Sequence, residues 1–342
     1  MKTTGGAWGS GGLSKRVDEG NLTETFQPEQ PVPAETAEAV GYDAVGHTAG
    51  WVHSPTVSQA RLLVLVAAVF WSTSGFFVKS PYLAGWQGER VAFWRAVFAC
   101  VALWPLVRRP RWSWALAPMT LLFAGMNYTY LTAMVKGSAA NAIWLQCTAP
   151  VWVLLVGVFL FGERAIRRDW LMVGCAMFGI AVIIYFESQR AIPDGAGSTL
   201  AAVLWGLASS FFYAGVVLSL RHLRGFDAVW LAALNHLVTV LILAPFAIGA
   251  GEMPSGIQWP FLAALGVLQM ALPYVLFAHS LKRIPGHEAT AIGLVEPLLN
   301  PVWVFLAWGN LPAWWTIVGG SFILIGLAVR YALPVPMAAT SD

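Results

Sequence analysis

The sequence predicts an all-α integral membrane protein whose ten transmembrane helices form two inverted five-helix repeats. Three observations predict this fold class: long apolar segments, basic residues that alternate between successive connections, and an internal repeat. Of the 342 residues, 58% are hydrophobic and only 11% are charged. Soluble domains carry about 25% charged residues, so most of this chain is expected to contact lipid or other apolar helices.

The two ends of the chain are expected to be tails rather than helices. Residues 1–57 are rich in Gly, Ser, Thr, Glu and Pro, a composition typical of disordered segments. They contain no apolar run long enough for the core of a signal peptide, so we predict a disordered cytoplasmic tail. A short cytoplasmic tail is also expected at 333–342, with the first repeat at 58–190 and the second at 198–332.

Apolar runs recur from Arg61 onward, each about as long as the 20-residue helix that crosses a bilayer core. Strands of a β-barrel would be shorter and would alternate apolar with polar residues, so helices are predicted. A polar break at Glu187–Ser198 separates the two halves. The expected spans are 61–79, 91–107, 113–134, 139–161, 169–186, 199–220, 228–249, 258–280, 287–308 and 312–331.

The charge of the connections predicts the orientation. If residues 1–57 lie in the cytoplasm, the even-numbered connections between spans are cytoplasmic too. Those connections carry ten Arg or Lys residues, whereas the odd-numbered connections and their borders carry four. Cytoplasmic loops are enriched in Arg and Lys, so we expect a multi-pass protein of the cell (cytoplasmic) membrane with both termini in the cytoplasm.

An internal repeat is visible when residues 133–163 are placed above 280–310 without a gap. The offset of 147 residues sets Pro150 on Pro297 and Gly162 on Gly309. Each half holds five spans, and because five is odd the second half is expected to enter the membrane upside down. Inverted repeats recur in secondary transporters, with the substrate site near the midplane between the halves.

Short motifs in both halves resemble those of the EamA-type family of the drug/metabolite transporter superfamily. The first half has Thr-Ala-Pro at 148–150 and Phe-Gly-Glu-Arg at 161–164, and the second has Val-Glu-Pro at 295–297. The resemblance covers about residues 60–331 and implies ten helices, cytoplasmic termini, and a central cavity lined by spans 1, 3, 4, 6, 8 and 9. One departure is Asn310, where the family commonly has Gly-Glu after the ninth span.

Two charged residues, Arg95 and Glu296, fall inside the predicted spans and away from their ends. Glu296 is the one acidic residue expected deep inside a span, where charge is costly and therefore suggests function. It could bind a coupling proton, bind a cationic or hydrogen-bonding group of the solute, or serve as a structural acid. Arg95 is expected to anchor its helix by snorkelling to the headgroups, with an anion or Glu296 contact as the alternative.

Uncharged polar and aromatic residues on the cavity spans are the remaining site candidates. Buried amides need hydrogen-bond partners, so those in the spans are expected to face the bundle interior. Pro150 and Pro297 occupy matching points of the two halves, where they permit kinks that suit either a rocking mechanism or static packing. The candidates for lining the cavity are Trp71, Asn127, Tyr130, Gln146, Tyr213, Gln269, Tyr274, Glu296 and Asn300.

These observations predict a secondary transporter, a permease or exporter of small metabolites or drugs, that works by alternating access with proton coupling as one option. The alternative is a membrane-embedded enzyme for a lipid or isoprenoid, although no DDxxD or HExxH motif is present. We expect no catalytic residue, metal or cofactor. The expected partners are a small-molecule solute and the lipid bilayer. Glycines in spans 5 and 10 would suit a homodimer face or packing within one chain, and no basic stripe indicates nucleic acid.

Overall fold

The computed structural model describes residues 55–189, 199–249 and 253–332. Within these ranges every regular element is a helix. The predicted tails lie outside the described residues apart from 55–57, and so does most of the predicted break at 187–198.

Helices cover all five segments predicted for the first half. Two of the segments are divided into two consecutive helices, and a short 3-10 turn, η1 (Pro81–Leu83), follows the first. The elements are α2 (Val57–Ser72) with α3 (Ser74–Val78), α4 (Gly88–Leu103) with the 3-10 turn η2 (Trp104–Leu106), α5 (Leu116–Lys136), α6 (Ala139–Gln146) with α7 (Ala149–Phe161), and α8 (Arg167–Ser188).

The second half follows the same pattern, and two of its segments are again composite. The elements are α9 (Thr199–His222), α10 (Ala228–Gly249), α11 (Gln258–Gly266) continued by the π-helix η3 (Val267–Ala271) and α12 (Leu272–Ser280), α13 (Gly286–Gly293) with α14 (Val295–Trp308), and α15 (Trp314–Tyr331).

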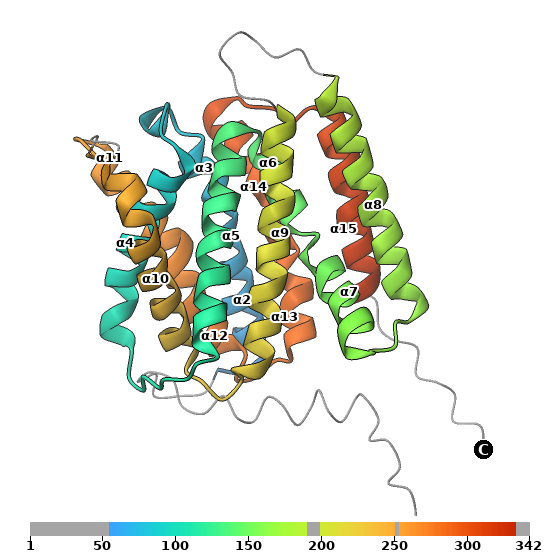
Figure 1. The fold of residues 1–342 in the computed structure, drawn as a ribbon, viewed down its shortest axis with the longest axis horizontal. Helices are drawn as coiled ribbons and strands as arrows, with labels where there is room; N and C mark the ends of the chain where they lie inside the picture. Colours follow the sequence, from blue (N-terminus) through green and yellow to red (C-terminus); the bar gives the residue numbers. More distant parts are fainter. Residues whose placement is uncertain (1–54, 190–198, 250–252, 333–342) are drawn as a thin grey trace, which may run out of the picture.

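Eight of these segments in the described part of the chain are long and apolar enough to cross a membrane. They comprise every segment named above except α4 and α5. The protein is therefore a multi-pass membrane protein. Helix α4 has only 16 residues, and both α4 and α5 lie within the bundle, where α4 packs against α10 and α5 packs against α9 (Figure 1).

The backbone reproduces the repeat at the predicted offset. Cys147 ends α6 with φ −62° and ψ −7°, and its counterpart Leu294 ends α13 with φ −61° and ψ −10°. Gly162 ends α7 at φ 67°, and its counterpart Gly309 ends α14 at φ 68°. Glycine suits both ends because left-handed backbone is strained for residues with a Cβ atom.

The two prolines at matching positions lie just after these interruptions rather than in the middle of a helix. Pro150 is in the first turn of α7, where its missing N–H group would have no helical partner anyway. Pro297 lies in the first turn of α14, whereas Pro301 lies inside that helix. The sequence analysis placed the kinks at Pro150 and Pro297. In the structure the helices are interrupted slightly earlier, after Gln146 and after Gly293.

Helices from the two halves pack side by side along the bundle. Helix α8 runs beside α15 at one edge, and α5 runs beside α9 near the middle (Figure 1). A Cβ atom on Gly179 of α8 would lie 2.3 Å from the carbonyl oxygen of Gly319 in α15. These glycines therefore allow close packing within one chain, one of the two roles that the sequence left open.

Candidate functional site

Arg95 is the centre of a buried hydrogen-bond network. Its side chain, on α4, is only 2% exposed, and it donates to the Asn127 Oδ1 atom on α5 and to the Gln269 Oε1 atom on η3, the latter at 3.2 Å. Gln269 in turn donates to the carbonyl oxygen of Trp71, also at 3.2 Å. Arg95 thus joins four elements, α4, α5, η3 and, through Gln269, α2. The prediction that Arg95 snorkels to the headgroups is wrong, because the side-chain amides of Asn127 and Gln269 replace the water that would hydrate its guanidinium group.

Aromatic rings surround this network. The ring of Trp71 meets the ring of Tyr274 edge-on at 5.5 Å, and Tyr274 lies 6.3 Å from the ring of His236. His236 is fully buried, and neither of its nitrogen atoms has a hydrogen-bond partner in the described part of the chain. Unpaired buried nitrogens are uncommon, so His236 belongs among the site candidates.

A second polar cluster joins α3, α5 and α14. The Ser74 Oγ atom lies 3.0 Å from the Tyr130 hydroxyl, and Asn300 donates from its Nδ2 atom to Ser74 Oγ at 2.7 Å. Asn300 is fully buried, and its Oδ1 atom has no partner among the described residues. Two of the predicted cavity residues, Tyr130 and Asn300, are therefore brought together by a serine.

Glu296 lies in the first turn of α14 and is partly exposed. Its carboxylate is within electrostatic range of the Tyr130, Tyr213 and Tyr274 hydroxyl groups. Arg95 is within electrostatic range of Tyr130 and Tyr274 as well. No ion pair joins Glu296 to Arg95 or to any other described residue. Tyr130 and Tyr274 thus interact electrostatically with both the Glu296 carboxylate and the buried Arg95 guanidinium.

Gln146 and Tyr213, like Tyr274 and Glu296, make no hydrogen bond in these networks. Gln146 ends α6 and is partly buried, with no hydrogen bond to another described residue. Tyr213 on α9 is 41% exposed, yet it remains within electrostatic range of Glu296 and Tyr274. The structure therefore links eight of the nine predicted cavity residues to Arg95, Ser74 or Glu296, directly or through a neighbouring residue, and Gln146 is the exception.

One face of α14 is tied to the first half by indole hydrogen bonds that the sequence analysis missed. Trp303 donates to Ser72 Oγ at 2.8 Å, and Trp308 donates to the Phe76 carbonyl oxygen at 2.7 Å. With Asn300 they occupy positions i, i+3 and i+8, which share one face of a helix. That spacing is visible in the sequence, but the serine and carbonyl acceptors on α2 and α3 are not.

Among the described residues, no group of three or more His, Cys, Asp or Glu residues is arranged to hold a metal ion. The arrangement instead offers amide, hydroxyl and aromatic groups with one base and one acid. Such a site suits reversible binding of a small polar molecule, because few precisely placed polar groups orient a ligand among aromatic rings.

Comparisons with known proteins identify a transporter family and relatives that are named as transporters. A model of the EamA-like transporter family matches residues 59–185 and 200–331. An uncharacterized transporter of Archaeoglobus fulgidus is 25% identical over 274 residues, covering 78% of this chain and 94% of that protein. The pseudopaline exporter CntI of Pseudomonas aeruginosa is 24% identical over 276 residues, covering 77% of this chain and 93% of the exporter.

A crystal structure solved for another protein has the same fold. It superposes on this chain with a TM-score of 0.56 at 18% identity, covering 80% of this chain and 97% of that one. At this identity the likeness concerns the fold alone.

Proposed function

The chain belongs to the EamA-like transporter family and is therefore a membrane transporter for small molecules, and from this premise we propose that it works by alternating access. In this mechanism two repeats, at 58–190 and 198–332, rock around a central site that opens to one side of the membrane at a time. Membership of a transporter family favours this function over the lipid-modifying enzyme.

We infer that ten helices cross the cytoplasmic membrane as two inverted five-helix repeats. The eight long apolar segments would be joined by α4 and α5, which lie among them in the bundle. An odd number of spans per half turns the second repeat over, and the alternating basic connections put both termini in the cytoplasm. A homodimer remains compatible with this arrangement.

The proposed solute site lies between Arg95 and Glu296. The observation that carries it is that Tyr130 and Tyr274 are within electrostatic range of both charges, while no ion pair joins the two. Because Arg95 and Glu296 are not paired with each other, each can bind a polar group of the solute. Tyr130 and Tyr274 would add hydroxyl groups and aromatic ring faces. We propose a small metabolite or drug with a cationic or hydrogen-bonding group as the solute.

Glu296 is the proposed coupling residue. When the solute leaves, a proton can take its place on the carboxylate, so proton entry on one side would be linked to solute exit on that side. One relative is named an exporter, so export is the direction we propose. Trp71, Asn127, Gln269 and Asn300 would position the solute and the charges through the hydrogen bonds described above.

The test uses purified protein in lipid vesicles with an imposed pH gradient and a panel of metabolites and drugs. Solute accumulation driven by the gradient is expected for the native chain and is expected to disappear in Glu296→Gln. The control is Glu288→Gln, because Glu288 lies near the start of α13 and pairs with Arg61 at 2.5 Å. Gradient-driven transport that persists unchanged in Glu296→Gln would show that Glu296 does not couple protons.

A further inference from the structure

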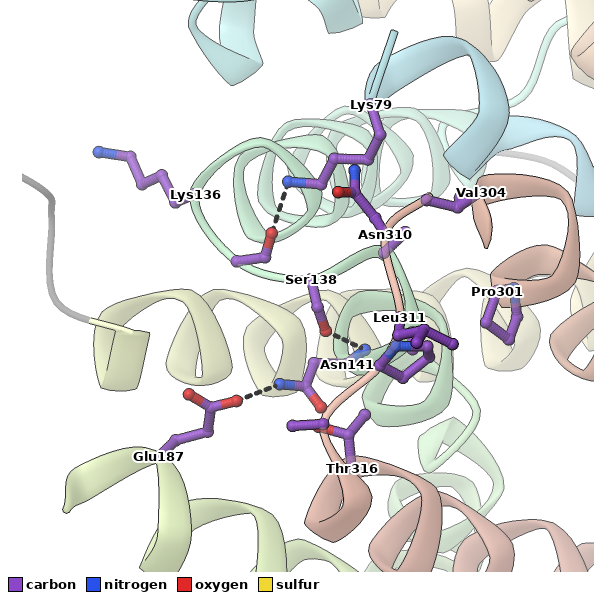
Figure 2. Close-up of a pocket in the computed structure, with 15 residues that line it drawn as sticks. Lys79, Lys136, Ser138, Asn141, Glu187, Pro301, Val304, Asn310, Leu311 and Thr316 are labelled. Carbon is purple, nitrogen blue, oxygen red and sulfur yellow. Dashed lines mark hydrogen bonds between the residues drawn. The ribbon is translucent and has the colours of Figure 1, made fainter. Parts of the chain in front are cut away.

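Charged side chains at the end of the bundle that is at the top of Figure 1 are mostly held by neighbouring residues. Figure 2 shows the Asn141 amide donating to Glu187 Oε1 at 2.9 Å. It also shows the Lys79 ammonium group donating to the Gly137 carbonyl oxygen at 2.5 Å. Of the charged residues labelled there, Lys136 alone extends away from the others. More unpaired charge lies at the opposite end of the bundle.

Two connections from different halves of the chain meet at that opposite end, at the bottom of Figure 1. One is 107–115, between η2 and α5, and its sequence alternates arginine with proline and tryptophan. The other is 223–227, between α9 and α10. We call their exposed arginines and tryptophans the lower patch. Its members are Arg108, Arg109, Arg111, Trp112, Trp114 and Arg224.

Arg111 and Trp230 hold the two connections against each other. The Arg111 Nη1 atom donates to the Gly225 carbonyl oxygen at 3.2 Å, and its guanidinium group lies 5.4 Å from the centre of the Phe226 ring. The Trp230 indole donates to the Arg111 carbonyl oxygen at 2.9 Å and meets the Trp112 ring edge-on at 5.1 Å. The lower patch is therefore one surface rather than two separate loops.

These contacts bring the arginines of the two connections together. Arg224 directly precedes Gly225, whose carbonyl oxygen accepts the hydrogen bond from Arg111. Arg108 and Arg109 precede Arg111 by three and two residues, and three residues of chain span at most about 11 Å. The four arginines therefore share one small surface, on which several guanidinium groups can contact the same anionic ligand.

The lower patch has a surplus of positive charge. Arg108, Arg109 and Arg224 are exposed, and none of them makes an ion pair with another described residue. Asp227 is the one acidic residue in the two connections. Its Oδ1 atom already accepts hydrogen bonds from two N–H groups in the first turn of α10, at 2.8 and 3.1 Å. Three guanidinium groups are therefore available to an anion.

Two exposed indoles accompany these arginines. Trp112 is 75% exposed and Trp114 is 95% exposed. Tryptophan is enriched where a transmembrane bundle meets the headgroup region, because its ring is apolar and its N–H group is polar. Arginine binds phosphate through two parallel N–H groups. Exposed indoles beside available guanidinium groups, at the end of a bundle, thus suit a lipid headgroup better than a soluble anion.

We propose that the lower patch binds the headgroup of an anionic phospholipid. Arg108, Arg109 and Arg224 donate hydrogen bonds to the phosphate oxygens, and Trp112 and Trp114 lie beside the glycerol and the adjoining acyl groups. Because the arginines come from both connections, the bound lipid bridges the two halves of the chain. The proposal does not depend on the central solute site, since it involves none of the predicted cavity residues.

The first test titrates the full-length protein in mild detergent with phospholipids and counts the bound lipids by native mass spectrometry. The probes are phosphatidylglycerol and phosphatidylcholine with the same acyl chains. Phosphatidylglycerol is expected to bind saturably and at least about tenfold more tightly, because each arginine near an anionic headgroup contributes favourable energy. Equal affinity for the two lipids would overturn the proposal.

A matched pair of double variants locates the bound lipid. Arg108→Gln with Arg109→Gln is expected to weaken phosphatidylglycerol binding about tenfold. Arg164→Gln with Arg167→Gln removes the same charge from exposed arginines at the same end of the bundle, beside two acidic residues of the connection between α7 and α8 and of the first turn of α8. This control should keep the native preference. Equal losses in the two double variants would indicate a diffuse surface potential and no lipid site.

A second matched pair tests the indoles. Trp114→Ala removes a ring that packs on almost nothing in the protein, since it is 95% exposed, and it should weaken phosphatidylglycerol binding about threefold through lost apolar contact with the lipid. Trp170→Ala removes another exposed indole near the same end, on α8, and should have no effect. An unchanged affinity in Trp114→Ala would contradict the proposed contact with lipid.

Competition distinguishes the lipid from other anions. Displacement of the bound lipid by glycerol phosphate would assign the arginines to a soluble phosphate ester and overturn the proposal. Tight binding of polyglutamate, without any preference between the two lipids, would assign them to an acidic protein. Glu296→Gln should keep the native affinity for phosphatidylglycerol, which separates the lower patch from the central site.

Discussion

At the scale of single residues, the chemistry is concentrated in a few polar groups that stand out in the sequence, but their interaction partners do not. Arg95 and Glu296 stand out in the sequence because charge is rare in apolar spans. The sequence does not show that Asn127 and Gln269 hold Arg95, because those residues lie 32 and 174 positions away along the chain. Only packing brings them together.

His236 gives the prediction at the scale of single residues. Both of its ring nitrogens are buried without a partner in the described chain, which costs stability. His236→Leu should therefore raise the free energy of unfolding by about 1 kcal/mol, measured by thermal denaturation in detergent, while solute transport falls. Stabilisation without any change of transport would assign the ring to packing alone, and destabilisation would show that its ring contacts with Phe123 and Tyr274 matter more.

At the scale of elements, the sequence predicted the helical segments to within a few residues because apolar length determines them. It did not predict the turn at Thr73 between α2 and α3, or the π-helix at Val267–Ala271. Neither interruption coincides with a proline: the turn lies in the short polar stretch Ser72–Ser74, and the π-helix lies in a run that is apolar except for Gln269. Local backbone conformation there depends on contacts with neighbouring helices, which hydropathy does not report.

The contact between α8 and α15 gives the element-scale prediction. A Cβ atom on Gly179 would meet the backbone of Gly319 at 2.3 Å, so Gly179→Ala must push the two helices apart. We expect it to cost about 1–3 kcal/mol, seen as a lower midpoint of thermal unfolding. Gly174→Ala on the same helix is the control, because its Cβ would meet nothing within 4 Å and alanine favours helix. Equal effects of the two would mean that the helices do not approach closely.

At the scale of the whole molecule, the contacts of α14 differ between its two ends. From its middle to its last residue, which lies at the top of Figure 1 and is called the upper end here, α14 is tied to α2 and α3. Asn300, Trp303 and Trp308 all donate hydrogen bonds to these two helices. In its first turn, the Glu296 carboxylate makes no hydrogen bond to another described residue and is partly exposed. The alternating access proposed above would require this row of hydrogen bonds to break when the upper end opens.

Weakening the row should therefore shift the protein toward an open upper end. Trp303→Phe with Trp308→Phe keeps the rings but removes two hydrogen bonds, each with a net value of about 1 kcal/mol. The population that is open at the upper end should rise by roughly tenfold or more.

Thiol labelling measures this population, in a chain whose native Cys100, Cys147 and Cys175 have been replaced. A cysteine at Val304, which is 4% exposed, should react correspondingly faster with a membrane-impermeant thiol reagent when both indoles have been removed. A cysteine at Leu311, which is 72% exposed, should react equally in both backgrounds. If Val304→Cys stays unreactive after both indoles are removed, the row of hydrogen bonds does not hold the upper end closed, and apolar packing of α14 against α3 must do so instead.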